Sequence, residues 1–508
     1  MSELPDGAPV TRESPDPAVP HTRLSGVWQQ AGQLPLDLVC FPLVFAVYAA
    51  HLFMSGYDRF YYDASLYWQL GQSFVSNGHF SLVAYSDQYH GYSAPLLYHV
   101  VQVVGSALGL GSVTTVKLFG SLLAATLGVV VLPRLARQLF PNASLDVGRV
   151  LALNGLIFLF WRGYFNFPLS DFPALLIATA GLLALLRGRP GGYLAAGLAF
   201  GLAANMRPAY QPALIACVAV AALVPWRPWN WRLRGAAAGL VLAGAFVAIL
   251  PQMLINHHQF DKWGPSLPGA KVIALQQLSD GLIAQKYETY VGPASEYPQP
   301  QVFHFDPATR HVLEQEGLPT TTIVFGQYDV IGSYGQYLGI VARHPVELAA
   351  SYVRHVFNGL DVRYPTPYVR DLGDTSILLS LLQYSLMFIA MLRLLLPDAR
   401  RALGRVRWAG LAVLLSPCLT VLASEAESRF FLPVQILIYM LVCFGPATRV
   451  SVLGGSIPRR IGVAVSYAMF ILVCLTLSSA SLAQRQFSNE ILGLGPTAHW
   501  ISTTFRTG

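Results

Sequence analysis

The sequence has few charged residues. Asp, Glu, Lys and Arg make up 12% of its 508 residues, against about 25% in soluble globular proteins. Hydrophobic residues make up 54%, and the mean hydropathy is +0.47. The composition therefore excludes a cytosolic enzyme and a nucleic-acid-binding protein. It predicts a polytopic membrane protein, because the apolar residues form blocks of about 17–23, long enough to cross a bilayer as a helix.

Lysine and cysteine are also scarce. The chain has only four lysines, so arginine carries most of the net charge of +7. In a membrane protein, clustered arginines indicate topology and contact with anionic lipids. The five cysteines lie inside apolar blocks without a C-x-x-C pair, which argues against a zinc site and a disulfide framework. They are Cys40, Cys217, Cys418, Cys443 and Cys474.

Two kinds of motif are absent. No glycine-rich nucleotide-binding motif occurs, so ATP and sugar nucleotides are poor candidates for direct substrates. Residues 1–34 are rich in proline and mixed charge, which predicts a disordered cytoplasmic tail. Because no apolar block lies within that tail, we expect no cleaved signal peptide.

The apolar blocks predict an all-α fold with about eleven transmembrane helices. We expect these near 36–54, 113–133, 148–166, 171–187, 191–206, 209–225, 235–256, 375–396, 406–423, 430–447 and 461–482. A further stretch, 93–111, is ambiguous, because counting it as a span gives twelve and moves the next arginines to the other side. If it lies along the outer membrane surface as a juxtamembrane or re-entrant helix, five arginine groups share one face, which the positive-inside rule makes cytoplasmic. The groups are Arg134/Arg137, Arg187/Arg189, Arg227/Arg232/Arg234, Arg400/Arg401/Arg405/Arg407 and Arg449/Arg459/Arg460.

This topology divides the chain into five parts. They are the tail 1–34, a transmembrane module 35–256 with an outer loop 55–112, an extracytoplasmic loop domain 257–374, C-terminal transmembrane helices 375–483, and an outer tail 484–508. The loop domain has too little periodicity for its mixed structure to be predicted. Within it, residues 345–359 form a helix with an apolar stripe through Val346 and Val353. This helix either lies in the membrane interface or packs as an ordinary outer helix.

Acidic residues that topology does not require gather on the predicted outer side. Asp58 and Asp63 follow the first span among aromatic residues, where an apolar boundary should raise a carboxyl pKa towards the range of a general base. Asp58, beside Arg59, is equally a solvated loop residue, and Asp63 could be a helix N-cap. Asp171 stands at the outer end of a span, where it could serve only the dipole of the next helix.

Two arginines also lie on this side. Arg207 ends the fifth span, where it could reach lipid headgroups or grip a phosphate with paired donors. The turn "ASEAESRFFLPV" carries Glu425, Glu427 and Arg429, more charges than a short connection needs. Arg429 departs from the positive-inside bias, although the turn could simply pair its own charges.

The order of several motifs resembles a known family. In chain order they are "DASLYWQLG", "SAPLLY", "VKLFGSLLAATLGVVVLPRLARQLF", "PLSDFP", "GLAANMRP" and "HPVELAASYV". Together they resemble the GT-C class of integral membrane glycosyltransferases, most closely the protein O-mannosyltransferase and lipid A aminoarabinose transferase group. The resemblance covers residues 36–256 well and the rest loosely.

The resemblance implies a transferase that uses a polyprenyl-phosphate sugar on the extracytoplasmic face. Asp63 matches the family's catalytic aspartate, Asp171 its second outer acidic position, and Arg207 a basic residue after a span. The chain departs from the family at Ala64, where a glutamate is frequent, and at Ser93-Ala94-Pro95, where Lys-Pro-Pro is frequent. The missing carboxylate weakens any metal site there.

These observations predict an inverting transfer. Asp63 is the expected general base, and Arg207 and Arg429 are the expected donor phosphate contacts. Asp171 and Asp58 are further acidic candidates, and the candidate acceptor or sugar contacts are Tyr62, His90, Tyr210 and Glu427. We expect no required cofactor and no metal ligands; a divalent cation stays open, although no motif supports one. The expected partners are the polyprenyl-phosphate sugar donor, membrane lipids and a hydroxyl of a cell-envelope glycan, lipid or protein.

Two alternatives stay open. A transporter or flippase of lipid-linked sugars would also have many spans, but the sequence shows no internal repeat of the kind transporters carry. An O-antigen ligase or polymerase type of enzyme would share the large outer loop. The preference for arginine over lysine suggests a bacterium, so we expect the inner (cytoplasmic) membrane, with the active site on the extracytoplasmic face. The sugar and the acceptor are not predicted.

Overall fold

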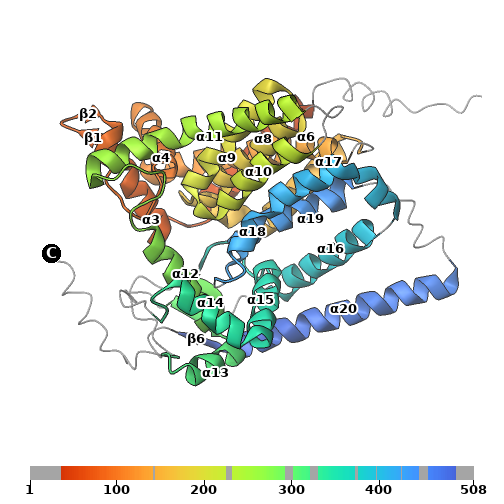
Figure 1. Ribbon diagram of the computed structural model, residues 1–508. Coiled ribbons are helices and arrows are strands. Elements are labelled where there is room, and N and C mark those ends of the chain that lie inside the picture. The colour runs from red at the N-terminus through yellow and green to blue at the C-terminus, as the bar shows by residue number, and fades with distance from the viewer. Residues whose placement is uncertain are drawn as a thin grey trace, which may run out of the picture.

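The computed structural model describes residues 36–140, 143–224, 231–291, 301–320, 330–371, 376–395, 397–424, 426–445 and 456–487. The predicted tail 1–34 and residues 488–508 of the predicted outer tail lie outside these ranges. The described chain is mostly helical. Figure 1 shows its long helices running side by side from left to right, with the shorter helices of the loop regions gathered towards the left.

Each predicted span of the N-terminal module corresponds to a helix. These are α2 (Leu36–Met54), α5 (Ser112–Ala125), α7 (Val147–Trp161), α8 (Asp171–Leu186), α9 (Pro190–Met206), α10 (Gln211–Leu223) and α11 (Trp231–Phe260). Helix α5 continues through the π-helical turn η3 (Thr126–Val131) into α6 (Leu132–Leu139). Arg134 and Arg137 therefore lie on the last turns of this helix and not in a loop.

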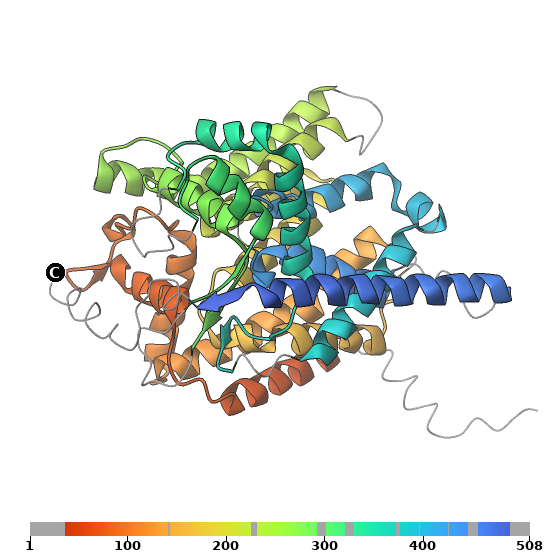
Figure 2. The same ribbon diagram turned by 90° about the horizontal axis from the view of Figure 1, so that it is seen from below.

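The C-terminal spans are also helical, but several are interrupted. They comprise α16 (Ile377–Leu395), α17 (Pro397–Leu415), α18 (Pro417–Thr420), η6 (Ser428–Phe431), α19 (Leu432–Phe444) and α20 (Ile457–Ala483). The chain turns within α17 at Gly404, whose φ of 55° favours glycine. Figure 2 shows α20 crossing the molecule as a long helix with much of its length clear of the bundle.

Five of the described helices are long and apolar enough to cross a membrane. They are Asp37–Met54, Ser112–Leu139, Trp231–Phe260, Ile377–Leu395 and Ile457–Ala483. Three shorter apolar helices are Asp171–Leu186, Pro208–Leu223 and Ser428–Phe444. These helices support a multi-pass membrane protein, while the count of eleven spans stays a prediction.

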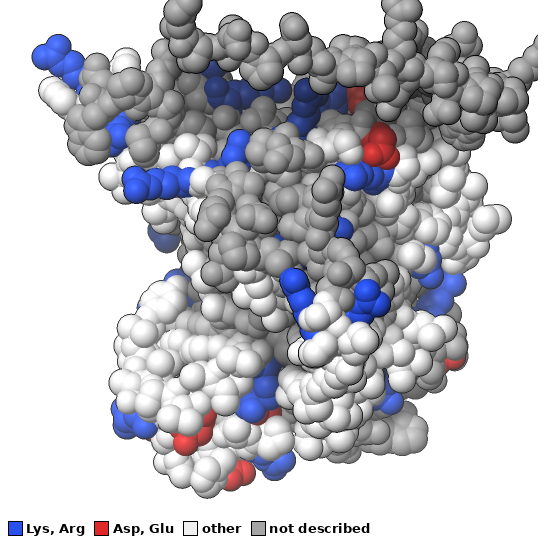
Figure 3. Space-filling model, turned by 90° about the vertical axis from the view of Figure 1, so that its right-hand side faces the viewer, with Lys and Arg blue, Asp and Glu red and all other residues white. Residues whose placement is uncertain are grey.

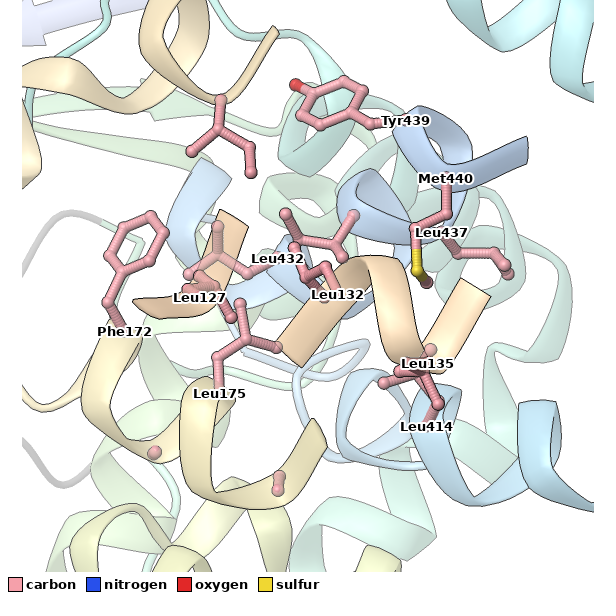
Figure 4. Packing of buried hydrophobic residues seen from close by; sticks show 14 of the residues in the cluster. Leu127, Leu132, Leu135, Phe172, Leu175, Leu414, Leu432, Leu437, Tyr439 and Met440 are labelled. Carbon is pink, nitrogen blue, oxygen red and sulfur yellow. The ribbon is translucent and has the colours of Figure 1, made fainter. Parts of the chain in front are cut away.

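The core is shared by N-terminal and C-terminal helices: α8 and α10 contact α17, and α7 contacts α19, while α9 packs against α11. Gly197 of α9 approaches the Val241 backbone, and Gly244 of α11 approaches Leu194, so that a Cβ on either glycine would clash. Small residues of this kind let membrane helices pack closely. Figure 4 shows buried side chains from α8, from the η3–α6 segment and from α17 and α19 filling one continuous layer. The labelled members are Leu127, Leu132, Leu135, Phe172, Leu175, Leu414, Leu432, Leu437, Tyr439 and Met440.

The ambiguous stretch 93–111 contains helix α4 (Ser93–Ala107). It packs against α3 (Tyr62–Leu70) and η1 (Gly71–Phe74) of the preceding loop, and against α5. Its Tyr98 hydroxyl donates a hydrogen bond of 2.6 Å to the Leu169 carbonyl. Helix α4 thus connects the 55–112 loop, of which it is a part, to the residues just before α8. Its position along the membrane surface stays a prediction.

The 257–374 region, which was expected to be mixed but whose fold was not predicted, combines helices with a sheet. It contains α12 (Ala270–Ile283), β3 (Ala284–Tyr290), β4 (Gln301–Phe305), α13 (Pro307–Gln315), α14 (Tyr334–Arg343), α15 (Pro345–Leu360) and β5 (Tyr368–Val369). The strand order is β5-β3-β4-β6, in which β6 (Arg485–Phe487) pairs antiparallel with β4. The first described residues of the predicted outer tail 484–508 are therefore part of the same sheet. A second, two-stranded sheet pairs β1 (Val75–Ser76) with β2 (His79–Phe80).

Helix α15 corresponds to the amphipathic helix predicted at 345–359. Val346 and Val353 of its apolar stripe are 75% and 68% exposed. The helix packs through another face, where Leu348, His355 and Asn358 are buried. The apolar stripe therefore points away from the protein, as an interfacial helix requires.

A buried ionic cluster fixes the sheet to the C-terminal helices. Lys286 Nζ of β3 lies 3.3 Å from Glu288 Oε1 and 4.0 Å from Asp361 Oδ2. Glu288 also pairs with His304 of β4 at 3.2 Å. Tyr384 of α16 donates to Asp361 at 2.7 Å. Because buried charges need partners, these contacts bind sheet and helices into one unit.

Candidate functional site

Five charged residues from distant parts of the chain converge at one end of the bundle. They are Asp63, Asp171, Arg207, Glu427 and Arg429, all of which the sequence analysis singled out. Each sits at or beside the end of a helix. Asp63 is in the first turn of α3, and Asp171 is the first residue of α8. The site is therefore built from helix ends, where the chain leaves the apolar layer.

Prolines help to set these helix ends. Pro208 follows Arg207 directly, and the residue before a proline is disfavoured in the helical region. Accordingly α9 ends at Met206, and Arg207 is extended, with φ −147° and ψ 108°. Pro433 lies at the start of α19, just after η6, the short turn that carries Arg429. The motif "MRP" thus explains locally why Arg207 projects from a helix terminus.

Arg429 is the centre of the cluster. One Nη atom lies 3.0 Å from Asp63 Oδ2, and the other lies 3.6 Å from Asp171 Oδ2. Its Nε lies 2.7 Å from Glu427 Oε2. The turn does pair its own charges, but Arg429 also joins the 55–112 loop to the start of α8.

Arg207 completes the pairing around Asp171. Its Nη1 donates to Asp171 Oδ1, and its guanidinium lies 4.8 Å from the ring centroid of Phe430. The side chain of Asp171 is 1% exposed and that of Arg207 is 17% exposed. A buried carboxylate shared by two guanidinium groups is more than a helix cap, and the guanidinium of Arg207 is directed to this carboxylate. Among the described residues, Asp171 accepts the hydrogen bond that the Arg207 guanidinium donates.

Asp63 is the most accessible acid of the cluster, with its side chain 50% exposed. The N-cap position of α3 is Tyr61 and Asp63 lies one residue inside the helix start, so the N-cap alternative for Asp63 is wrong. Partial burial of the carboxyl opposes its ionisation, but the charge and hydrogen bond of Arg429 outweigh it and lower the pKa of Asp63. The predicted rise in its pKa is therefore wrong for the ligand-free site, because the sequence did not reveal this partner.

The backbone beside Asp63 is strained. Tyr62 has a φ of 39°, in the left-handed region that side chains other than glycine rarely adopt. Its ring stacks on Tyr368 with centroids 6.2 Å apart, and the Tyr368 hydroxyl accepts a 3.2 Å hydrogen bond from the N–H of Ala64. Such strain is of the order of 1–3 kcal/mol and concentrates at functional sites. Tyr368 of β5 thus holds the turn that presents Asp63.

Glu427 differs from Asp63 in its electrostatics. Burial raises the pKa of Glu427, and the neighbouring Arg429 only partly offsets this. With all five groups charged, three carboxylates face two guanidinium groups, which leaves one negative charge in excess. Because the pKa of Glu427 is raised and that of Asp63 is lowered, Glu427 takes up a proton more readily than Asp63, which would remove that excess.

The remaining predicted contacts surround the cluster at different distances. Tyr210 is buried and lines a cavity of about 10 Å³ together with Asp171, Arg207 and Arg429. His90 lies with its ring centroid 5.4 Å from that of Tyr67 and bonds to Asp87 at 3.1 Å. A cavity of this size holds no more than one water molecule, so a larger ligand requires the site to widen.

Three aromatic residues of the site were missed by the sequence analysis. Phe430 lies under Arg207, Tyr368 holds the Asp63 turn, and Tyr67 accepts a 3.1 Å hydrogen bond from the Ser170 hydroxyl. Tyr67 and Phe430 lie in motifs rich in aromatic residues, where they look like members of an interfacial belt. Only their position beside charged residues could have singled them out.

Asp58 does not join the cluster. It is exposed, and its position beside Arg59 fits the loop alternative. The described residues also contain no group of three or more His, Cys, Asp or Glu side chains arranged to hold a metal ion. The expectation of no required metal or cofactor stays a prediction.

No protein-family model matches the chain, and no curated protein matches it. Among solved structures, the chain is similar to the archaeal oligosaccharyltransferase AglB from Archaeoglobus fulgidus, in complex with an inhibitory peptide and a dolichol-phosphate. The similarity has a TM-score of 0.41 and 12% identity over 91% of this chain, which spans 56% of the length of that one. Similarity at this level does not establish a shared function.

Proposed function

We propose that this protein is an inverting membrane glycosyltransferase that moves a sugar from a polyprenyl-phosphate donor to a hydroxyl acceptor. The observation that carries the proposal is the convergence of an accessible carboxylate, Asp63, with the guanidinium groups of Arg207 and Arg429 at one end of an apolar bundle. The motif order that resembles GT-C enzymes supports the same function. We assign the site to the extracytoplasmic face of a bacterial inner membrane.

Asp63 is the proposed general base. Attack by an acceptor hydroxyl on the anomeric carbon requires removal of the hydroxyl proton, which a carboxylate within reach accepts. The low pKa of Asp63 in the free site keeps it ionised at neutral pH. Its half-exposed side chain is the one acid of the cluster that an incoming acceptor can approach without displacing buried groups.

Arg207 and Arg429 are the proposed phosphate contacts. As the acceptor oxygen bonds to the anomeric carbon, the bond from that carbon to the phosphate oxygen breaks, and the lipid phosphate leaves with the electron pair. Guanidinium groups stabilise the charge that develops on the leaving oxygen. With the base and the leaving phosphate on opposite faces of the sugar, the configuration inverts.

Donor binding would also change the pKa of Asp63. A phosphate that engages Arg429 competes with Asp63 for the same donors, and the added negative charge opposes ionisation of the carboxyl. Both effects raise the pKa of Asp63 from its low value in the free site. Asp63 would thus become a stronger base when the donor is in place.

The decisive experiment is direct transfer by the purified full chain. The protein in detergent or liposomes is incubated with radiolabelled polyprenyl-phosphate sugars (arabinose, aminoarabinose and mannose forms) and with envelope glycan, lipid or protein acceptors. We expect donor-dependent label in one acceptor, of inverted anomeric configuration, that Asp63→Asn abolishes. Movement of intact labelled donor across sealed liposomes without transfer would support the transporter alternative. Joining of preassembled glycans from a lipid diphosphate would support the ligase or polymerase alternative.

A further inference from the structure

A second charged site lies at the other end of the bundle from the Asp63–Arg429 cluster. Helix α8 begins at Asp171 in that cluster and ends in the C-cap Arg187. Its 16 residues span about 24 Å at the usual rise per residue. Around Arg187, the ends of α2, α6, α7 and α17 enclose a cavity of about 550 Å³.

This cavity is basic. Four arginines line it, and Asp37 is the one acidic side chain among its described lining residues, which leaves a net charge of +3. The arginines are Arg134, Arg137, Arg187 and Arg407. They belong to three of the five arginine groups identified in the sequence. Figure 3 shows the right-hand side of the molecule, where blue Lys and Arg side chains are far more evident than red acidic ones.

The four arginines differ in whether their side chains already have hydrogen-bond acceptors within the protein. Arg134 pairs with Asp37 and donates to the Val130 carbonyl, and Arg407 Nε donates to the Gln138 carbonyl at 3.1 Å. No acceptor for the side chains of Arg137 and Arg187, both exposed, is found within the described parts of the chain. These two guanidinium groups retain their donors for a ligand, and arginine binds phosphate oxygens through paired donors.

The surroundings of the cavity favour an amphipathic ligand. Its lining contains Val129, Leu145, Val150 and Leu183 beside the arginines. On α2, directly after Asp37, Leu38 and Leu43 are 67% and 50% exposed, so an apolar surface continues from the mouth of the cavity along the helix. Basic pockets between transmembrane helices bind anionic headgroups in this way.

We infer that this cavity binds the phosphate group of an anionic phospholipid, with the acyl chains lying along the exposed face of α2. The volume lies within the range of small-molecule sites, about 300–1,000 Å³. A free phosphate would satisfy the guanidinium groups but would make no use of the apolar lining residues and the exposed leucines. This inference is independent of the proposed transfer reaction, because the two sites lie at opposite ends of α8.

The test measures lipid-dependent thermal stability of the delipidated full chain. Phosphatidylglycerol, phosphatidylcholine and inorganic phosphate are titrated separately, and native mass spectrometry records retained lipid. We expect phosphatidylglycerol to raise the Tm with saturation, phosphatidylcholine to do so much less, and inorganic phosphate to have little effect. A ligand that binds only the folded state stabilises it in this concentration-dependent manner.

Two variants locate the site. Arg187→Gln, and the double variant Arg137→Gln/Arg187→Gln, should weaken the apparent phosphatidylglycerol affinity by about tenfold or more. Arg189→Gln removes the same charge two residues away, outside the cavity lining, and should behave like the unaltered protein. Equal stabilisation by both lipids, or equal loss in Arg187→Gln and Arg189→Gln, would overturn the inference. Stabilisation by inorganic phosphate that matches the lipid would show a free-anion site instead.

Discussion

The guanidinium of Arg429 lies 3.0 Å from a carboxylate oxygen of Asp63, although the two residues are 366 positions apart in the sequence. This contact joins the 55–112 loop to the turn before α19. It also sets the charge state of Asp63, because the arginine outweighs the effect of burial and lowers the pKa of the carboxyl. The C-terminal helices are therefore part of the site and not only an anchor.

Replacement of Asp63 by Asn should abolish turnover while donor binding persists. The amide keeps the shape of the side chain but accepts no proton, and loss of a general base costs about 10²–10⁴ in rate. Transfer kinetics and donor binding are measured on the same preparation. Asp58→Asn is the matched control, because Asp58 is exposed and outside the cluster. An active Asp63→Asn together with an inactive Asp58→Asn would place the base elsewhere.

Arg207→Lys should lower the affinity for the lipid-phosphate donor even though the charge is kept. Lysine loses the planar group that lies over Phe430 and pairs with Asp171 at the same time. We expect about a tenfold or greater rise in the donor KM, and a further fall in kcat for Arg207→Ala. The contrast variant is Arg310→Lys on α13, whose side chain is 52% exposed. Unchanged donor KM and kcat in both Arg207 variants would exclude this phosphate contact.

The pH dependence should differ between kcat/KM for the donor and kcat. The first reports the free enzyme, in which Arg429 lowers the pKa of Asp63, so activity is lost only as the pH falls through that low value. In contrast, kcat reports the donor complex, in which the phosphate engages Arg429 and weakens its contact with Asp63. The acid limb of kcat should therefore lie at higher pH than that of kcat/KM. Coincident limbs would mean that the donor leaves the Asp63–Arg429 pair intact.

Residues 93–111 should lie on the outer side of the membrane. A cysteine at Ser112, which is exposed after α4, should react with a membrane-impermeant maleimide added outside intact cells. A cysteine at Arg187 should react only after the cells are opened. Four native cysteines are buried and Cys443 is partly buried, so background labelling should be low. Labelling of residue 112 from the cytoplasm alone would refute the eleven-span topology.

Lys286→Met should destabilise the fold without touching the Asp63 site. The substitution leaves Glu288 and Asp361 buried with fewer partners. Removal of one partner of a buried ion pair typically lowers the free energy of unfolding by about 3–5 kcal/mol. Thermal unfolding in detergent is the measurement. Lys271→Met, at an exposed position of α12, should leave the Tm almost unchanged. Equal Tm values for the two variants would show that the cluster adds no net stability.

Much of the helical frame could be predicted from the sequence. The apolar blocks located the helices because each must bury or expose a long apolar surface, and Asp171 and Arg207 stood out as charges at the ends of such blocks. The pairing of these charges could not be predicted, since it depends on how α8, α9 and η6 pack. For the same reason the pKa of Asp63 was predicted in the wrong direction.

The strands of the mixed 257–374 region could not be located from the sequence for a different reason. Strand β3 reads "AQKYETY", in which Lys286 and Glu288 look like solvent-facing residues, whereas both are buried and paired in the structure. The burial of Lys286 depends on Asp361, which lies after α15. A pattern of alternating apolar residues cannot reveal a strand whose inward side chains are charged.

Strand β6 has a consequence for how the protein is made. It follows α20 in the chain, yet it pairs with β4, which precedes α16. During synthesis, β3, β4 and β5 emerge first, and β4 keeps an unpaired edge until α20 has been inserted and the residues after it have reached the same compartment. An open edge is a template for wrong pairing. We therefore expect this protein to need a chaperone most while it is still a ribosome-bound chain that ends before residue 485.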